Sequence, residues 1–370
     1  MAGVYISWPF CAQKCTYCNF ASGVFPLELE AEYLEALCAE LASTAWPWTP
    51  GTVYLGGGTP SSMEPRALQR ILRAMPGRPW QEATLETAPG ALQRENVKAW
   101  HALGINRVSL GVQSFIEDEL RRTGRKHTAA DVERDVELLR SCGIDEISID
   151  LIAGLPAQTR ASWSESLRWI EKLKPPHVSI YMFEIDEDSR LGQEMLLGGV
   201  RYGAQLTPDE ETTVALYEEA VDRLDAAGLR RYEISNFALP GHESRHNLKY
   251  WKLEPYLGFG ADAHSFDGLL RWQNSESAVD YVARWKSGAV ARVAETPAVA
   301  CEERFFVGLR LMEGVEPTPA ERLLHAEPIS RMVQAGLLEA TGAKLRLTRR
   351  GVLLSNEVFQ EFLAPPCPVN

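Results

Sequence analysis

VYISWPFCAQKCTYCNF, from Val4 to Phe20, joins a short strand-like run to three cysteines that fall within eight residues. Cys11, Cys15 and Cys18 follow the spacing C-x3-C-x2-C. Three closely spaced thiolates can bind three of the four irons in a cubic iron-sulfur cluster. The spacing therefore predicts such a cluster, with one iron left open for another ligand.

Two alternatives stay open at this point. A structural zinc site takes four Cys or His ligands, but no histidine precedes His101, and Cys38 is the only other early cysteine. Three cysteines can also be core residues without reactivity, because free cysteine is often buried. The close spacing favours the iron-sulfur cluster over both.

Composition indicates a soluble globular protein with a substantial core. The chain has 370 residues, of which 45% are hydrophobic and 24% charged, and its net charge is −12. That acidic balance argues against general attraction to nucleic acid or anionic lipid. The sequence shows neither a signal-peptide pattern nor an apolar run long enough for a membrane helix. An odd number of cysteines, four of them widely scattered, suits a reducing compartment. We expect a cytoplasmic protein.

Strand and helix patterns alternate through the first two thirds of the chain. The predicted strands are the run before the cysteines, Thr52–Leu55, Ala83–Thr87, Arg107–Val112, Glu146–Ile152 and Val178–Phe183. The predicted helices are Glu28–Leu41, Arg66–Met75, Leu92–Leu103, Ala129–Ser141, Ser162–Leu173 and Asp209–Ala227. Six strand-helix units favour an α/β fold, a partial (β/α)6 TIM-like barrel that is open on one side.

The rest of the chain shows a different pattern. Tyr232–Phe237 is a candidate for one more strand, and an irregular stretch rich in His, Asn, Tyr, Trp and Gly follows it. Helical patterns at Ala300–Met312 and Pro328–Ala335, and a hairpin of Leu337–Glu339 with Lys344–Leu347, predict a small α+β winged-helix-like domain. We divide the chain into a barrel at 1–237, a connecting segment at 238–296 and a C-terminal domain at 297–370. The acidic charge disfavours DNA binding by that domain.

Several unusual residues follow predicted strands, where the chemistry of a barrel takes place. Gly56-Gly57-Gly58-Thr59-Pro60 can expose backbone groups to a ligand, because glycine puts no side chain in the way. Glu86, Gln113 and Asp150 lie at or near the ends of three other strands. Arg125 can pair with a carboxylate through two hydrogen bonds. Each residue alone also suits an ordinary loop or helix cap, but together they predict a site.

Five motifs in order resemble the radical S-adenosylmethionine (SAM) superfamily, in the branch that holds oxygen-independent coproporphyrinogen III oxidase and HemW. The resemblance covers nearly the whole chain. The motifs are PFC before the remaining cysteines, GGGTP at 56–60, GVQSF at 111–115, IDLIAGLP at 149–156 and HNLKYW at 246–251.

This resemblance implies that Cys11, Cys15 and Cys18 hold a [4Fe-4S] cluster whose open iron takes the amino and carboxylate groups of SAM. Such a cluster can cleave SAM to a 5′-deoxyadenosyl radical, and the protein supplies position and shielding from solvent. The residues implied to contact SAM or the cluster are Tyr5, Tyr17, Gly57, Gly58, Thr59, Glu86, Gln113, Arg125 and Asp150.

The resemblance separates two functions within the branch. The resemblance implies the pattern C-x3-C-x2-C-x-C for the oxidase, with a longer segment before it. In this chain Phe20 stands at the position of that last cysteine, and ten residues precede Cys11. Both differences favour the HemW-like function, a haem chaperone that delivers haem to respiratory haemoproteins. The alternative is a coproporphyrinogen III dehydrogenase or another porphyrin-modifying radical SAM enzyme. We assign no catalytic residue.

Haem as cargo requires a place to bind. An imidazole is a natural ligand of haem iron, so His246, in the HNLKYW motif, is the first candidate and His264 the second. Tyr250 and Trp251 can cover a porphyrin face. A HemW-like role also implies contact with membrane-bound partners, and peripheral membrane contact stays possible.

Overall fold

Six parallel strands form the centre of the computed structural model, which describes residues 2–363. Each strand pairs in parallel with the next in sequence, as the sequence predicted. They are β1 (Gly3–Trp8), β2 (Thr52–Gly57), β3 (Glu82–Thr87), β4 (Arg107–Gln113), β5 (Glu146–Ala153) and β6 (His177–Met182). The predicted α/β partial barrel is confirmed.

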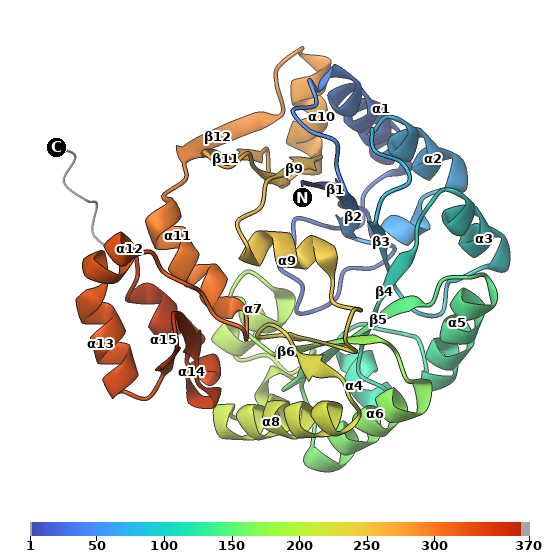
Figure 1. Cartoon of the computed structure of the whole chain (residues 1–370). Coiled ribbons are helices and arrows are strands. Elements are labelled where there is room, and N and C mark those ends of the chain that lie inside the picture. Colours follow the sequence, from blue (N-terminus) through green and yellow to red (C-terminus); the bar gives the residue numbers. More distant parts are fainter. Residues whose placement is uncertain (1, 364–370) are drawn as a thin grey trace.

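Helices surround these strands on the outside (Figure 1). They are α1 (Leu27–Ser43), α2 (Pro65–Arg73), α3 (Arg94–Ala102), α5 (Ala129–Ser141), α6 (Arg160–Leu173) and α8 (Glu210–Ala226). Two shorter helices, α4 (Glu117–Arg122) and α7 (Arg190–Leu197), were not predicted. They are only six and eight residues long, too short for a clear helical period.

The two faces of the barrel differ in polarity. Outward-facing residues such as Val4, Ile6 and Leu55 are fully buried in the hydrophobic core beneath the helices. Because side chains alternate along a strand, the intervening residues face inward. The inward side chains that contact one another include Tyr5, Tyr54, Glu86, Ser109, Asp150 and Ser179. The interior is therefore polar, unlike a barrel filled by aliphatic side chains.

Six further strands extend the sheet at both edges, in the order β12-β11-β10-β9-β1-β2-β3-β4-β5-β6-β8-β7. Beside β1 lie β9 (Tyr256–Phe259), β10 (His264–Phe266), β11 (Leu270–Asn274) and β12 (Arg292–Pro297), and beside β6 lie β8 (Asn236–Ala238) and β7 (Arg230–Arg231). The edge strands β12 and β7 end this order, so the barrel is open.

These edge strands correct the prediction for this part of the chain. The predicted strand Tyr232–Phe237 is only partly correct, because β8 begins at Asn236 and a bend at 234–235 precedes it. The stretch at 238–296, expected to be irregular, contains four strands and the helices α9 (Arg245–Trp251) and α10 (Ala278–Lys286). Strands of three to six residues carry little periodic signal, and the parallel partner of β9 is β1, at the far end of the sequence.

The C-terminal region lies beside the barrel (Figure 1). It contains α11 (Ala300–Phe306), α12 (Pro319–Leu324), α13 (Ala326–Gln334), β13 (Leu338–Thr341), β14 (Lys344–Leu347), α14 (Arg349–Leu353) and α15 (Ser355–Gln360). The predicted hairpin is confirmed as β13 and β14, which are antiparallel. The helix predicted for Ala300–Met312 is too long, because α11 ends at Phe306 and a 3-10 turn follows. The three-part division of the chain stays a prediction.

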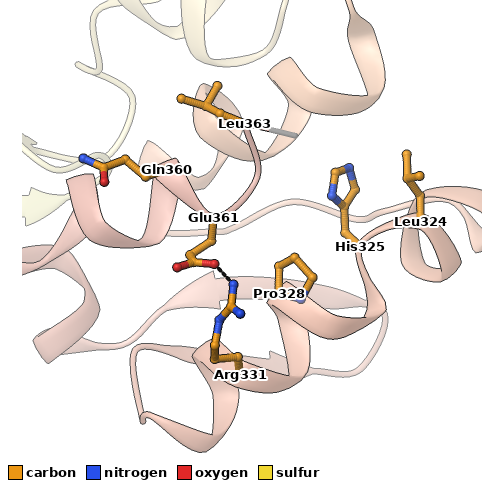
Figure 2. A pocket seen from close by; sticks show the side chains of 7 residues that line it. All are labelled: Leu324, His325, Pro328, Arg331, Gln360, Glu361 and Leu363. Carbon is orange, nitrogen blue, oxygen red and sulfur yellow. Dashed lines mark ion pairs between the residues drawn. The ribbon is translucent and has the colours of Figure 1, made fainter. Parts of the chain in front are cut away.

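Figure 2 shows a surface pocket in this region, where Arg331 of α13 pairs with Glu361. His325 at its wall is 3% exposed and packs against the rings of Phe305 and Phe362. These contacts give His325 a packing role. Within residues 2–363, no helix is long and apolar enough to cross a membrane.

Candidate functional site

The cysteine loop leaves the carboxyl end of β1 and is fixed by backbone hydrogen bonds. At its base the Cys11 N–H donates to the Gly23 carbonyl, and the Gly23 N–H donates to Pro9. In its middle the Thr16 N–H donates to Thr123, and the Thr16 carbonyl accepts from the first turn of α7. Three separate parts of the chain therefore hold the loop.

The three thiols of the loop are free, partly exposed and close enough to interact electrostatically. Burial raises the pKa of Cys11; the hydroxyls of Thr59 and Ser22 oppose this rise, and Cys18 and Cys15 add to it. In the part of the chain that the structure describes, no three His, Cys, Asp or Glu side chains converge tightly enough to hold a single metal ion. A cubic cluster binds each cysteine through a different iron, so its ligands need not converge on one point.

The glycine run after β2 lies against the cysteine loop. A Cβ added to Gly58 would lie 2.6 Å from the Phe10 carbonyl oxygen, so only glycine fits there. The N–H groups of Gly58 and Thr59 donate to Trp8 and Phe10, and the N–H of Gly57 donates to Glu86. The predicted exposure of backbone groups is therefore limited, because these three N–H groups are already engaged. The run serves first to tie the loop to β2.

Glu86, on β3, lies beneath the glycine run. Its two carboxylate oxygens accept from the Tyr54 hydroxyl at 2.7 Å and from the Gly57 N–H at 3.2 Å. Burial raises the pKa of Glu86 to about 7, nearby Asp150 adds to the rise, and the two hydrogen bonds oppose it. This carboxyl group can therefore gain or lose a proton near neutral pH.

This shift predicts how the stability of the protein without cofactor depends on pH. The pKa of Glu86 is about 7 in the folded chain against an ordinary 4.5, so the folded state binds the extra proton between these values. The contribution of Glu86 to the free energy of unfolding should therefore fall by about 3 kcal/mol as pH rises from about 4 through 7, and stay level above about pH 8. We expect Glu86→Gln to remove this fall in urea unfolding at pH 5 and pH 8. The exposed Glu64→Gln is the control. Equal pH slopes for wild type and Glu86→Gln would contradict the expectation.

Gln113, Arg125 and Tyr17 meet at the end of β4. Gln113 has φ 70° and lies at a bulge in the pairing of β4 with β5, which turns its side chain out of the regular alternation. The Arg125 guanidinium donates to the Gly111 carbonyl at 2.9 Å and lies 3.5 Å from the Tyr17 hydroxyl. Burial lowers the pKa of Arg125, but Tyr17 and Cys15 raise it and prevail. Its Nε is buried without a partner, so this cation can accept a further anionic ligand.

Asp150 lies on β5, inside the barrel. Its Oδ1 accepts from Ser179 at 2.7 Å and from Ser148 at 3.1 Å, and its Oδ2 accepts from Ser109 at 2.8 Å. Burial raises the pKa of Asp150, and the three serine hydroxyls oppose this rise. A carboxylate can accept about four hydrogen bonds, so Oδ2 keeps room for one donor from a ligand.

A small pocket opens between the cysteine loop and the strand ends. Tyr5, Gly57 and Glu86 line it, with Ser22 and Phe20 of the cysteine loop and Asp262 of the β9–β10 turn. Phe20 is 66% exposed at this pocket. The structure thus brings the cysteines, the glycine run and Glu86 to one place, with Gln113 on β4, Asp150 on β5 and Arg125 in the loop between α4 and α5 nearby.

The two candidate haem ligands do not line this pocket. His246 of α9 is fully buried at the amino ends of the strands: its Nδ1 is 2.9 Å from the Thr52 hydroxyl and its Nε2 is 2.8 Å from the Tyr250 hydroxyl. Burial lowers the pKa of His246 to about 3, and Lys249 adds to this. His264 is exposed at the start of β10. Both ring nitrogens of His246 are engaged, which favours a structural role for it.

Sequence reasoning missed several residues at the site. They are Ser22, Tyr54, Ser109, Ser148, Ser179 and Asp262. Ser109, Ser148 and Ser179 had a readable signal, since they are polar residues within apolar strands. Asp262 had none, because its place beside β1 depends on strand pairing over a long sequence distance.

The chain is similar to known proteins over most of its length. Residues 5–170 match the family described as the radical SAM superfamily. The chain is 33% identical to the heme chaperone HemW of Lactococcus lactis, over 97% of this chain and 96% of that protein. It is 34% identical to the heme chaperone HemW of Bacillus subtilis, over 98% and 99% of the two chains.

Among solved structures, the fold resembles Escherichia coli coproporphyrinogen III oxidase (HemN), described as a radical SAM enzyme. The TM-score is 0.85, with 98% of this chain and 89% of the other covered. The sequences are 20% identical, so this likeness shows the fold alone.

Proposed function

This chain belongs to the HemW family within the radical SAM superfamily, and on that premise we propose that it binds a [4Fe-4S] cluster and SAM and delivers haem to other proteins. The loop of Cys11, Cys15 and Cys18 beside the small pocket supports the cofactor half of this proposal. The HemW relatives support the cargo half. We further propose respiratory haemoproteins as acceptors and the cytoplasm as the location.

The residues present fit these cofactors. Three thiols on a fixed loop would hold three irons, and the buried, unpaired Nε of Arg125 suits an anionic group. When bound, the reduced cluster supplies an electron that can cleave SAM. We propose Tyr5, Tyr17, Gly57, Gly58, Thr59, Glu86, Gln113, Arg125 and Asp150 as the contacts that hold SAM.

The protein's own residues would orient this ligand by charge. Arg125 provides a cation at the end of β4, next to Tyr17 and Cys15. Glu86 of β3 and Asp150 of β5, on the strands that flank β4, provide carboxylates that accept from donors. SAM carries a carboxylate that suits the Arg125 cation, and amino and sugar hydroxyl groups that suit the Glu86 and Asp150 carboxylates.

Phe20 is the observation that favours haem delivery over porphyrinogen oxidation. Phe20 stands two residues past the last cysteine of the loop, at the position where the resemblance implies a fourth cysteine in the oxidase. It is 66% exposed beside the pocket. A phenyl ring supplies no thiol to the site and offers an apolar surface at the pocket.

A paired assay on one anaerobically reconstituted preparation tests this function. We expect one haem to bind each protein and to pass to an apo-haemoprotein acceptor, with no conversion of coproporphyrinogen III in the presence of SAM and a reductant. The measurements are a haem titration by absorbance and product analysis by chromatography. Turnover of coproporphyrinogen III would support the oxidase alternative and reject the chaperone. The reconstituted protein without haem is the control for transfer.

The axial haem ligand stays unassigned in this proposal. The earlier prediction of His246 receives no support from its position, since the ring is fully buried and bonded through both nitrogens. His264 is accessible, at the start of β10.

A further inference from the structure

A chain of hydrogen bonds runs through the barrel from helix α9 to Asp150. The Ser244 N–H, at the amino end of α9, donates to the Tyr232 hydroxyl oxygen at 3.2 Å. The Tyr232 hydroxyl lies 2.9 Å from His177 Nε2, and His177 Nδ1 lies 2.7 Å from the Ser148 hydroxyl. Ser148 then donates to Asp150 Oδ1 at 3.1 Å. We call Ser244, Tyr232, His177 and Ser148 the relay.

The hydrogen-bond direction is fixed at both ends of this chain, at the Ser244 N–H and at the Asp150 carboxylate. A backbone N–H can only donate, and an ionised carboxylate can only accept. Ser148 has one proton and gives it to Asp150, so it must accept from the Nδ1–H of His177. A neutral imidazole has one N–H, so His177 Nε2 must accept from Tyr232. One arrangement of protons therefore satisfies the whole relay.

The surroundings keep His177 neutral. Its side chain is 2% exposed, and burial lowers its pKa well below the ordinary value, with Arg107 adding to the effect. Arg107 itself lies 3.7 Å from Glu82 and 3.4 Å from Glu146 at the amino ends of the strands. A neutral ring with a single tautomer can hold the Ser148 hydroxyl in one orientation.

We propose that Tyr232 and His177 are positioning residues, which keep the Ser148 proton turned to Asp150 and so set how tightly Asp150 binds a donor group of SAM. This inference rests on the proposed SAM site. Ser148 supplies one of the three hydrogen bonds that orient the carboxylate. Without the His177 N–H, the Ser148 hydroxyl loses the donor that fixes it and can turn away. The relay also gives the HNLKYW helix a link to the site without contact with SAM.

The equilibrium affinity for SAM, measured on full-length iron-loaded protein, tests the proposal through a graded series. We expect Ser148→Ala and His177→Leu to weaken SAM binding about 10-fold, the usual cost of losing a group that orients a ligand. His177→Asn keeps an N–H near the Nδ1 position, and Tyr232→Phe keeps the imidazole, so both should lose only about 3-fold. Tyr217→Phe, which removes another buried hydroxyl outside the relay, should bind as wild type.

A second measurement does not depend on SAM. NMR of 15N-histidine-labelled protein should show His177 as a neutral ring with its proton on Nδ1. A proton on Nε2, or a charged ring at neutral pH, would overturn the relay even if SAM binds. Wild-type affinity in both Ser148→Ala and His177→Leu would overturn the positioning role. Failure of wild type to bind SAM, with the expected tautomer present, would instead reject the proposed function and the role of the relay in SAM binding.

Discussion

Cys11→Ala, Cys15→Ala and Cys18→Ala should each lose most of the iron and sulfide that wild type takes up on anaerobic reconstitution. Each variant removes one of the three loop thiols that we propose as ligands of the cluster. Iron and sulfide analysis, together with the charge-transfer absorbance of the cluster, measures the loss. The variants should stay folded, because backbone hydrogen bonds hold the loop.

Cys142→Ala is the matched control, since Cys142 is also free and partly exposed but lies next to Ser141 and Arg94, away from the loop. It should reconstitute as wild type. Full iron content in any of the three loop variants would reject that cysteine as a ligand. Zinc in place of iron in wild type would support the structural zinc alternative.

Gly58→Ala should destabilise the protein and also disturb the cluster site. The added Cβ would lie 2.6 Å from the Phe10 carbonyl oxygen and 2.8 Å from the Trp8 carbonyl oxygen, both of them backbone atoms that cannot rotate away. We expect a loss of about 3 kcal/mol in the free energy of unfolding. Because Phe10 adjoins Cys11, the shift that relieves the clash should also lower iron uptake.

Gly288→Ala separates this clash from the general cost of replacing glycine. Gly288 has φ 74°, and a Cβ there meets no atom within 4 Å. This variant should lose about 1 kcal/mol through backbone strain alone and keep wild-type iron content. Urea unfolding and iron analysis of both variants give the comparison. Similar losses in the two variants would contradict a special role for Gly58.

The barrel could be predicted from the sequence because its strands and helices alternate with clear periods. Val4, Ile6 and Val53 belong to apolar runs that local patterns reveal. The strands β9 to β12 could not be found in this way. They are short, and what stabilises β9 is its pairing with β1, which no local pattern records.

Site residues could be predicted where the residue type or its spacing is unusual, and not where the residue type is common in any strand. Cysteines at close spacing and polar residues at strand ends are unusual, so Cys11 and Asp150 stood out. Ser148 and Ser179 are ordinary residues whose role depends on the carboxylate between them. His246 shows the opposite limit, because a sequence does not reveal whether an imidazole is exposed or already bonded on both sides.

The cysteine loop is held in place by backbone hydrogen bonds before any iron is bound. In zinc fingers the metal organises the chain, and the apo protein is unfolded. Here Cys11 and Thr16 are held by contacts with Gly23, Thr123 and α7 that need no metal. Preorganisation of this kind lowers the entropy cost of binding. If the proposed cluster is lost to oxidation, we therefore expect the folded protein to accept a new one without refolding.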